Sequence, residues 1–284
     1  MHINNIYILG EKMKKTYKPK KSIKILFILI IIIFCLFLYG RYLNTNSLKV
    51  KEIAIIDENL PINYNGLKIA HFSDIHYGRT TTEETLKKVT NELNKLNADI
   101  IVFTGDLFDK INISEKEKTT LTNNLKNIKA KLFKFAIIGD YDENYLSTYK
   151  NILEDSNFIL LDNASKLVYN KSTTAINFIG LTSTDDIEEL YNNDYFNITL
   201  IHKPDLIQKI NNSNIVLAGH SMGGQIRIPF IGGIKKIDGA KKYIDSYYNV
   251  NNQQLYISNG IGTQDISFRY FNSPSITLYR LYNN

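Results

Sequence analysis

Short apolar runs alternate with amphipathic stretches from about residue 50 to the end of the chain. Five of these runs are rich in β-branched or aromatic residues and are bounded by turn residues, which is typical of buried strands. Two stretches between them, 81–96 and 114–128, have apolar residues at helical spacing and begin with Thr or Ser followed by Glu, which favours a helix N-terminus. The predicted buried strands are 67–73, 99–105, 131–139, 197–201 and 214–219. Strands that alternate with helices indicate an α/β fold.

Four further runs also have the character of strands, which is more than a single parallel sheet needs. They lie at 166–170, 174–181, 254–258 and 275–281. An additional edge strand is expected near 50–57, within a linker that extends from residue 40 to residue 65. We therefore place the main domain at 66–284.

The most apolar part of the chain is the run from Ile23 to Tyr39, which only Lys24 interrupts. Its length is at the short end for a helix that spans a membrane. A cleaved signal peptide would have a shorter apolar region and a small-residue cleavage site, and no such site follows this run. A buried core helix would not carry a block of lysines on one side. We therefore predict an uncleaved transmembrane anchor at 23–39, preceded by a short basic tail at 1–22.

The positive charge of the chain is concentrated before this apolar run. The formal net charge is +6, and seven lysines lie between Lys12 and Lys24. Because positive residues stay on the cytoplasmic side, we expect a single-pass protein of the cell membrane, with its N-terminus in the cytoplasm and everything after Arg41 on the outer face. The rest of the chain is close to neutral and has no basic and aromatic stripe, so nucleic acid is not an expected partner.

Two smaller features concern the same region. Met13 begins a sequence typical of the start of an anchor, so translation is expected to begin at either Met1 or Met13. The single cysteine, Cys35, lies inside the apolar run. Disulfides within the globular part are therefore excluded, and the cysteine count does not assign a redox compartment.

Each of the five predicted buried strands is followed by a carboxylate or an imidazole. Any one of these alone would be an ordinary turn former, helix cap or surface group. Together they are expected to meet, because ligand sites of open α/β sheets lie outside the carboxyl ends of the strands. Carboxylates combined with imidazoles suit Mn, Fe or Zn better than Ca or Mg alone. The predicted metal ligands are Asp74, His76, Asp106, Asp140, His202 and His220.

The stretch 214–229, NIVLAGHSMGGQIRIP, also contains the pattern G-x-S-x-G of a serine nucleophile elbow. In α/β-hydrolases the acid and then the histidine follow the nucleophile along the chain. No histidine follows Ser221, and only 63 residues remain after it. A serine hydrolase that uses Ser221 is therefore an alternative that the order of the residues disfavours.

The segments FSDIHYG, FTGDLFD, IIGDYDEN, LIHKP and LAGHSMGGQIRIP resemble the five sequence blocks of the calcineurin-like metallophosphoesterases. The resemblance covers about residues 66–284 and is greatest to the bacterial membrane-associated phosphodiesterase branch. It implies a four-layer α/β/β/α sandwich with two divalent metal ions, and a bridging hydroxide that attacks phosphorus in line. It implies that Asp74, His76 and Asp106 hold one ion, and that Asp106, Asp140, His202 and His220 hold the other.

Two blocks depart from the family pattern. The third block is usually G-N-H-D or G-N-H-E and here contains Asp140 and Tyr141. Asp140 keeps an oxygen ligand, but Tyr141 replaces a histidine that contacts the phosphate, and an ordinary phenol is uncharged at neutral pH and a poor proton donor. In the last block Met222 replaces the second histidine of G-H-x-H. Because a thioether is a weak ligand for a hard ion, we expect the first metal site to be weak.

Two functions are compatible with these departures. One is a working phosphoester hydrolase, most simply a phosphodiesterase, in which Tyr141 forms a hydrogen bond to the substrate. The other is a degenerate family member that binds metal or phosphate with little turnover. All five strand-end positions are retained, which favours the hydrolase. The predicted location on the outer face suggests an envelope lipid or a wall polymer as substrate.

Four further residues near the blocks have two interpretations each. Asp109 and Asp142 are expected to orient metal ligands or to form turns. Arg79 and Arg227 are either phosphate contacts or exposed surface arginines.

Overall fold

The computed structural model describes residues 21–284 apart from 79, 110–112, 172, 184 and 186. The chain divides into two compact units, Met1–Leu38 and Tyr39–Asn284. In the first unit, α1 (Lys21–Leu38) forms within the predicted apolar run, and none of its side chains is buried. The helical path continues as η1 (Tyr39–Asn44), and Lys21–Asn44 is, among the described residues, the one helix long and apolar enough to cross a membrane. All but the last two residues of the predicted basic tail lie outside the described part of the chain.

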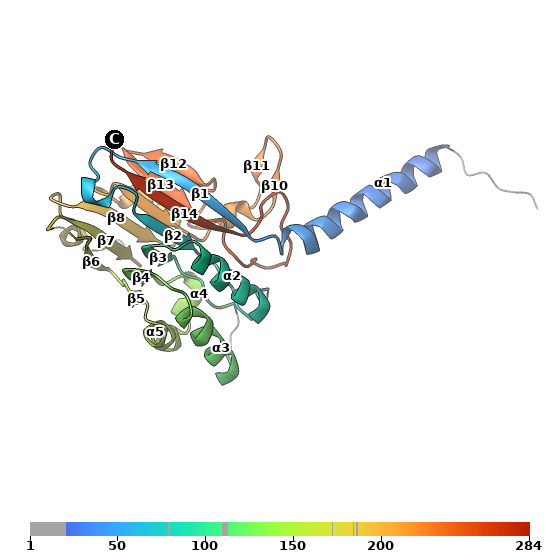
Figure 1. Cartoon of the computed structure of the whole chain (residues 1–284). Coiled ribbons are helices and arrows are strands. Elements are labelled where there is room, and N and C mark those ends of the chain that lie inside the picture. Colours follow the sequence, from blue (N-terminus) through green and yellow to red (C-terminus); the bar gives the residue numbers. More distant parts are fainter. Residues whose placement is uncertain (1–20, 79, 110–112, 172, 184, 186) are drawn as a thin grey trace, which may run out of the picture. The chain divides into compact units, whose positions relative to one another are not determined.

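The second unit contains two six-stranded sheets and a two-stranded hairpin (Figure 1). In the first sheet β14 pairs in parallel with β1 and antiparallel with β2, and β2 to β5 run parallel. Its strands, in spatial order, are β1 (Lys49–Ile56), β14 (Ser275–Tyr282), β2 (Lys68–Phe72), β3 (Ile100–Phe103), β4 (Phe133–Ala136) and β5 (Ile159–Leu160). The predicted edge strand near residues 50–57 is therefore present as β1.

The second sheet has a parallel centre and an antiparallel strand at each edge. Its strands, in spatial order, are β12 (Tyr247–Val250), β13 (Gln253–Ile257), β9 (Ile215–Ala218), β8 (Phe196–Ile201), β7 (Ala175–Leu181) and β6 (Ala164–Tyr169). The separate hairpin consists of β10 (Arg227–Ile228) and β11 (Gly232–Gly233). All nine strands predicted after residue 65 are confirmed.

The alternation of side chains along the strands produces three buried layers. In β3, Ile100 and Val102 face the second sheet and pack in the core between the sheets. Ile101 and Phe103 face the opposite way and pack against helices. Beyond the second sheet, Val216 and Ala218 of β9 belong to a third cluster. The two sheets are therefore stacked face to face with a shared apolar core.

Four α-helices lie in the first half of this unit: α2 (Glu83–Lys95), α3 (Glu115–Lys126), α4 (Asp140–Glu143) and α5 (Leu146–Asp155). Thr82 caps α2, and Ser114 caps α3 in a capping box with Glu117, as the sequence predicted. Buried residues of α2, α3 and α5 cover the outer face of the first sheet. These helices form the first layer of the predicted sandwich.

The outer face of the second sheet has a thinner cover. In the described part of the chain it consists of the 3-10 helices η3 (Glu188–Leu190) and η4 (Pro204–Lys209), together with Tyr243 and neighbouring residues. The remaining 3-10 helices are η2 (Ile62–Tyr64) and η5 (Met222–Gly224). The α/β sandwich is confirmed, and in the described residues its fourth layer is made of 3-10 turns and irregular segments in place of the predicted α-helices. The domain boundaries expected from the sequence stay a prediction.

Candidate metal centre

The residues predicted as ligands follow the carboxyl ends of five parallel strands. Asp74 and His76 follow β2, Asp106 follows β3, and Asp140 begins α4 after β4. In the other sheet, His202 comes directly after β8, and His220 follows β9 after one glycine. Because β2, β3 and β4 are neighbours in one sheet and β8 and β9 are neighbours in the other, the ends of both sheets contribute to one site.

The backbone at this site adopts a conformation that the sequence did not reveal. Asp74, His76, Asp106 and His220 all have positive φ, between 48° and 64°. The left-handed region is sparsely populated by residues other than Gly, and it costs energy that the surrounding structure must offset. Such strain persists where packing fixes it, and it turns each side chain sharply away from its strand.

Two glycines allow the second and third blocks to approach closely. A Cβ atom on Gly105 would lie 2.6 Å from the backbone nitrogen of Gly139, and a Cβ on Gly139 would lie 2.3 Å from the nitrogen of Asp106. The fully buried carboxylate of Asp142 joins the same segments. Its oxygens accept hydrogen bonds from the backbone nitrogens of Asp106 at 2.8 Å, Leu107 at 2.9 Å and Gly139 at 3.0 Å. Asp142 therefore fixes Asp106, as the sequence interpretation expected of a positioning carboxylate.

Two groups of ligand atoms meet at Asp106. Atoms from Asp74, His76 and Asp106 all lie within 4.8 Å of one another, and so do atoms from Asp106, His202 and His220. All five residues are buried. Oδ2 of Asp106 lies 3.8 Å from Nε2 of His76 and 3.1 Å from Nε2 of His202. One carboxylate is therefore shared by both groups.

Hydrogen bonds orient both histidines of the second group. Nδ1 of His202 lies 2.7 Å from the carbonyl oxygen of Thr104, and Nε2 of His220 lies 2.6 Å from that of Asp238. Because a carbonyl oxygen only accepts, these nitrogens carry the protons. Nε2 of His202 and Nδ1 of His220 are then left facing each other at 3.2 Å. A carbonyl oxygen that accepts a hydrogen bond from one ring nitrogen sets the tautomer in which the other ring nitrogen can bind a metal ion.

Asp140 lies at the margin of the second group. Its Oδ2 lies 3.8 Å from Nδ1 of His220, and its Oδ1 pairs with Nζ of Lys203 at 2.8 Å. Its side chain is 37% exposed, in contrast to the buried ligands. The sequence analysis did not select Lys203, although it follows His202 directly and brings a positive charge to the site.

The pKa values of Asp74 and His202 indicate that the buried candidate ligands attract positive charge. Burial raises the pKa of Asp74 to about 7; His202 opposes this increase and the charge of Asp106 adds to it. Burial lowers the pKa of His202, but the charge of Asp106 and its hydrogen bond more than offset this and raise it to about 10. The site therefore holds protons where a divalent cation would supply the charge, and this donor set fits a metal ion.

The two departures from the family pattern lie within this environment. The backbone nitrogen of Tyr141 donates to Oδ1 of Asp106 at 2.9 Å, and its ring meets the His76 ring edge-on at 5.0 Å between centroids. Met222 is buried, has a φ of 48°, and its carbonyl oxygen accepts a hydrogen bond from Nδ2 of Asn272. Tyr141 therefore contacts two of the candidate ligands, and Met222 follows His220 in the same loop; the roles expected for both residues stay predictions.

Ser221 has the contacts of a turn residue. Its Oγ accepts a hydrogen bond from the nitrogen of Gly223 at 3.1 Å and donates to the carbonyl oxygen of Ile244 at 3.4 Å. Both partners are backbone groups, so these bonds give no support to a serine nucleophile. Arg227 pairs with Asp245 at the surface, and Arg79 lies outside the described residues.

Comparison with known proteins agrees with this geometry. Residues 67–224 match the family described as Calcineurin-like phosphoesterase. A Bacillus subtilis protein named uncharacterized metallophosphoesterase YkuE is 30% identical over 258 residues, which cover 86% of this chain and 88% of that protein. The chain therefore belongs to the calcineurin-like phosphoesterases and is, by family, a metal-dependent hydrolase.

Two more distant relatives have informative names. UDP-2,3-diacylglucosamine pyrophosphatase LpxG of Chlamydia muridarum is 24% identical, over 86% of this chain and 92% of its own length. A Danio rerio protein named transmembrane protein with metallophosphoesterase domain is also 24% identical, over 87% of this chain and 60% of its own length.

Proposed function

We propose that the chain is a membrane-anchored phosphoester hydrolase with a dinuclear metal site. The observation that carries this proposal is the position of Asp106, whose carboxylate belongs to two groups of buried ligand atoms. Asp74, His76 and Asp106 would hold the first ion. Asp106, His202 and His220 would hold the second, with Asp140 beside them. The facing nitrogens of His202 and His220 support this assignment, because a metal ion between them would replace the proton that the raised pKa of His202 keeps there.

The ions, when bound, supply Lewis-acid stabilisation of the phosphoryl oxygens and lower the pKa of a water molecule. The remaining work falls to side chains of this chain. Nζ of Lys203, which pairs with Asp140, supplies positive charge at the margin of the site. The hydroxyl of Tyr141 donates a hydrogen bond to a substrate oxygen. Asp142 keeps Asp106 in place through the three backbone bonds that its carboxylate accepts.

The substrate class is proposed from the position of the apolar helix and from the relatives. A domain attached to a membrane meets its substrates there, and LpxG is named for a substrate that carries acyl chains. We propose a phosphodiester or pyrophosphate of the cell envelope, carried by a lipid or a wall polymer. The lysine block before α1 supports an outer-face location for this reaction.

The first experiment compares two isosteric variants of the full chain in detergent. Asp106→Asn replaces the shared carboxylate, and Asp194→Asn changes an exposed carboxylate and serves as a matched control. The protein is loaded with Mn²⁺, and the bound metal is counted by mass spectrometry. Hydrolysis of bis-p-nitrophenyl phosphate is measured on the same samples.

We expect two metal ions per chain and measurable turnover in the wild type and in Asp194→Asn. Asp106→Asn is expected to lower turnover by about 100-fold or more and to lower the metal content. Full metal binding without turnover of any phosphoester would instead support the degenerate family member. Turnover that Asp106→Asn leaves unchanged would contradict the proposal.

A further inference from the structure

The β10–β11 hairpin carries large apolar side chains into solvent. Phe230, between the two strands, is fully exposed, and Ile231 beside it is 73% exposed. Ile228 and Ile234 on either side of the turn are also exposed. The hairpin stands out from the sheets in Figure 1. Exposed apolar groups concentrated in this way mark a surface that contacts another apolar phase.

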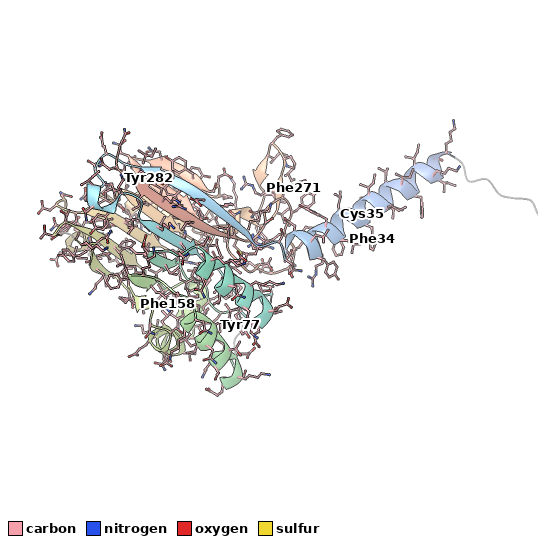
Figure 2. All side chains as sticks on the ribbon, in the orientation of Figure 1. Phe34, Cys35, Tyr77, Phe158, Phe271 and Tyr282 are labelled. Atoms are coloured by element: carbon pink, nitrogen blue, oxygen red, sulfur yellow. The ribbon has the colours of Figure 1, made fainter. Side chains whose placement is uncertain are left out.

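A second segment with exposed apolar residues adjoins the hairpin. Ile266 is 57% exposed and Phe271, labelled in Figure 2, is 55% exposed. The nitrogen of Arg227 donates to the carbonyl oxygen of Tyr270 at 2.8 Å, which joins the two segments. We refer to the six exposed side chains on these segments as the apolar rim: Ile228, Phe230, Ile231, Ile234, Ile266 and Phe271.

The apolar rim lies where the chain enters the globular unit. Tyr39 follows the last residue of α1, and its ring lies 5.9 Å from that of Tyr270 and 6.3 Å from that of Phe271, between centroids. The nitrogen of Arg269 donates to the carbonyl oxygen of Gly40 at 3.1 Å. The rim is therefore fixed within a few residues of the point where an apolar helix ends. Tyrosines at such a point are typical of a membrane interface.

The apolar rim is also tied to the candidate metal centre. The hairpin belongs to the loop between His220 and Asp238. The hydrogen bond from Nε2 of His220 to the carbonyl oxygen of Asp238 joins the two ends of this loop. At its base, Nε2 of Gln225 donates to the carbonyl oxygens of Ile266 and Phe268, both at 3.0 Å. The rim and His220 therefore belong to one hydrogen-bonded loop.

We propose that the apolar rim inserts into the acyl-chain boundary of the membrane that holds α1. The occupant of this surface is lipid, and the rim holds the metal centre at the level of the headgroups. A phosphoester near the membrane surface then reaches the site without leaving the bilayer. This inference rests on the membrane anchoring proposed above, and it does not require that any particular phosphoester is turned over.

The test uses the absence of tryptophan from the sequence. Phe230→Trp gives a single fluorescent reporter on the rim of the full chain. Tyr169→Trp places the same reporter on β6, at a side chain that is 50% exposed, and is the control. Each variant is reconstituted into vesicles of phosphatidylcholine and phosphatidylglycerol, with and without lipids brominated on their acyl chains.

We expect the bromolipid to quench Trp at position 230 at least about twofold more strongly than Trp at position 169, because an inserted residue reaches the acyl chains. Equal quenching at both positions would overturn the proposal. A blue-shifted and unquenched Trp at position 230 would also overturn it. That result, with cross-linked dimers, would show that a second copy covers the rim.

A second variant links the rim to catalysis. Phe230→Asp combined with Ile231→Asp changes only exposed side chains, so the fold is expected to be retained. The ratio of turnover on a vesicle-borne phosphodiester to turnover on bis-p-nitrophenyl phosphate is expected to fall by about tenfold. An unchanged ratio would contradict the inference. If the wild-type chain hydrolyses neither substrate, that result contradicts the proposed function. The quenching experiment would then still test whether the rim inserts into the membrane.

Discussion

Nε2 of His202 and Nδ1 of His220 lie 3.2 Å apart, and the second nitrogen of each ring already faces a carbonyl oxygen. Because the pKa of His202 is raised to about 10, its Nε2 carries a proton at neutral pH, and this proton faces Nδ1 of His220 and Oδ2 of Asp106 at a place that a metal ion could take. The two carbonyl contacts fix the orientation of both rings and direct the other nitrogen of each ring to a common place, which fits the proposed metal site.

Metal binding should therefore stabilise the folded chain through these two histidines. At about 100 times its dissociation constant, Mn²⁺ is expected to stabilise the wild type by about 2.7 kcal/mol. His220→Ala should lose most of this gain, because it removes one nitrogen and leaves the other without its counterpart. The measurement is thermal unfolding of the full chain in detergent, with Mn²⁺ and with EDTA.

Ser221→Ala is the matched control for that experiment, because it changes the next residue in the same loop. We expect it to keep both the stabilisation by Mn²⁺ and the hydrolysis of bis-p-nitrophenyl phosphate. Loss of hydrolysis with metal binding intact would instead revive Ser221 as a nucleophile.

The two departures from the family pattern predict a gain of function. Tyr141→His combined with Met222→His restores an imidazole at each position, and proton transfer by a positioned group is typically worth 10² to 10⁴ in rate. We expect kcat to rise by about 10-fold or more, and the metal content of the first site to increase. Tyr141→Phe should lower kcat, because it removes the hydroxyl that donates to the substrate. No gain from the double variant would mean that these positions do not limit turnover.

Asp142 should contribute to stability and activity together. Asp142→Asn places an NH₂ group against at least one backbone N–H group, since both carboxylate oxygens accept hydrogen bonds. An unsatisfied buried group costs about 1–3 kcal/mol, so we expect a loss of that size in the free energy of unfolding. Turnover should fall as well, because Asp106 is no longer fixed. A variant with wild-type stability would show that the segments do not depend on these bonds.

His71 gives the fold a defined sensitivity to acid. It is fully buried, with Nε2 2.8 Å from Oγ1 of Thr104, and burial lowers its pKa to about 3. Because the pKa of His71 is near 6.5 in the unfolded chain, protonation of this histidine favours the unfolded state. The contribution of neutral His71 to the free energy of unfolding is complete above about pH 6.5 and is lost as the pH falls from there towards about 3.

His71→Gln should therefore reduce the loss of stability between about pH 7.5 and about pH 5 by roughly 2 kcal/mol. The free energy of unfolding is compared at the two pH values in EDTA, so that metal release does not contribute. An equal acid dependence in wild type and variant would show that another group dominates.

Much of the fold was predictable because its strands are buried on both faces. Runs such as 197–201 and 214–219 are continuous, apolar and bounded by turns, and they formed β8 and β9. The hairpin β10–β11 was missed because strands of two residues have no period. Helix α5 was missed because Tyr145 at its N-cap makes no side-chain hydrogen bond, so the usual start signal is absent.

The candidate site, like the fold, was predictable from the sequence only in part. Residue type and position at the strand ends were enough to name the residues that the structure brings together in both groups, and their role as metal ligands stays a prediction. Lys203 and the carbonyl of Asp238 were missed, because one is an ordinary surface residue by type and the other is a backbone atom. The marginal place of Asp140 follows from its pairing with Lys203, which only the folded chain reveals.

The order of strands in the first sheet constrains how the protein is made. β14, the last strand in the chain, lies between β1 and β2, the first two. During synthesis β1 and β2 emerge before β14, and a position between them stays vacant until β14 follows. The edges of β1 and β2 that face this position therefore stay unpaired until β14 is made, and in the meantime they are open to pairing with other strands.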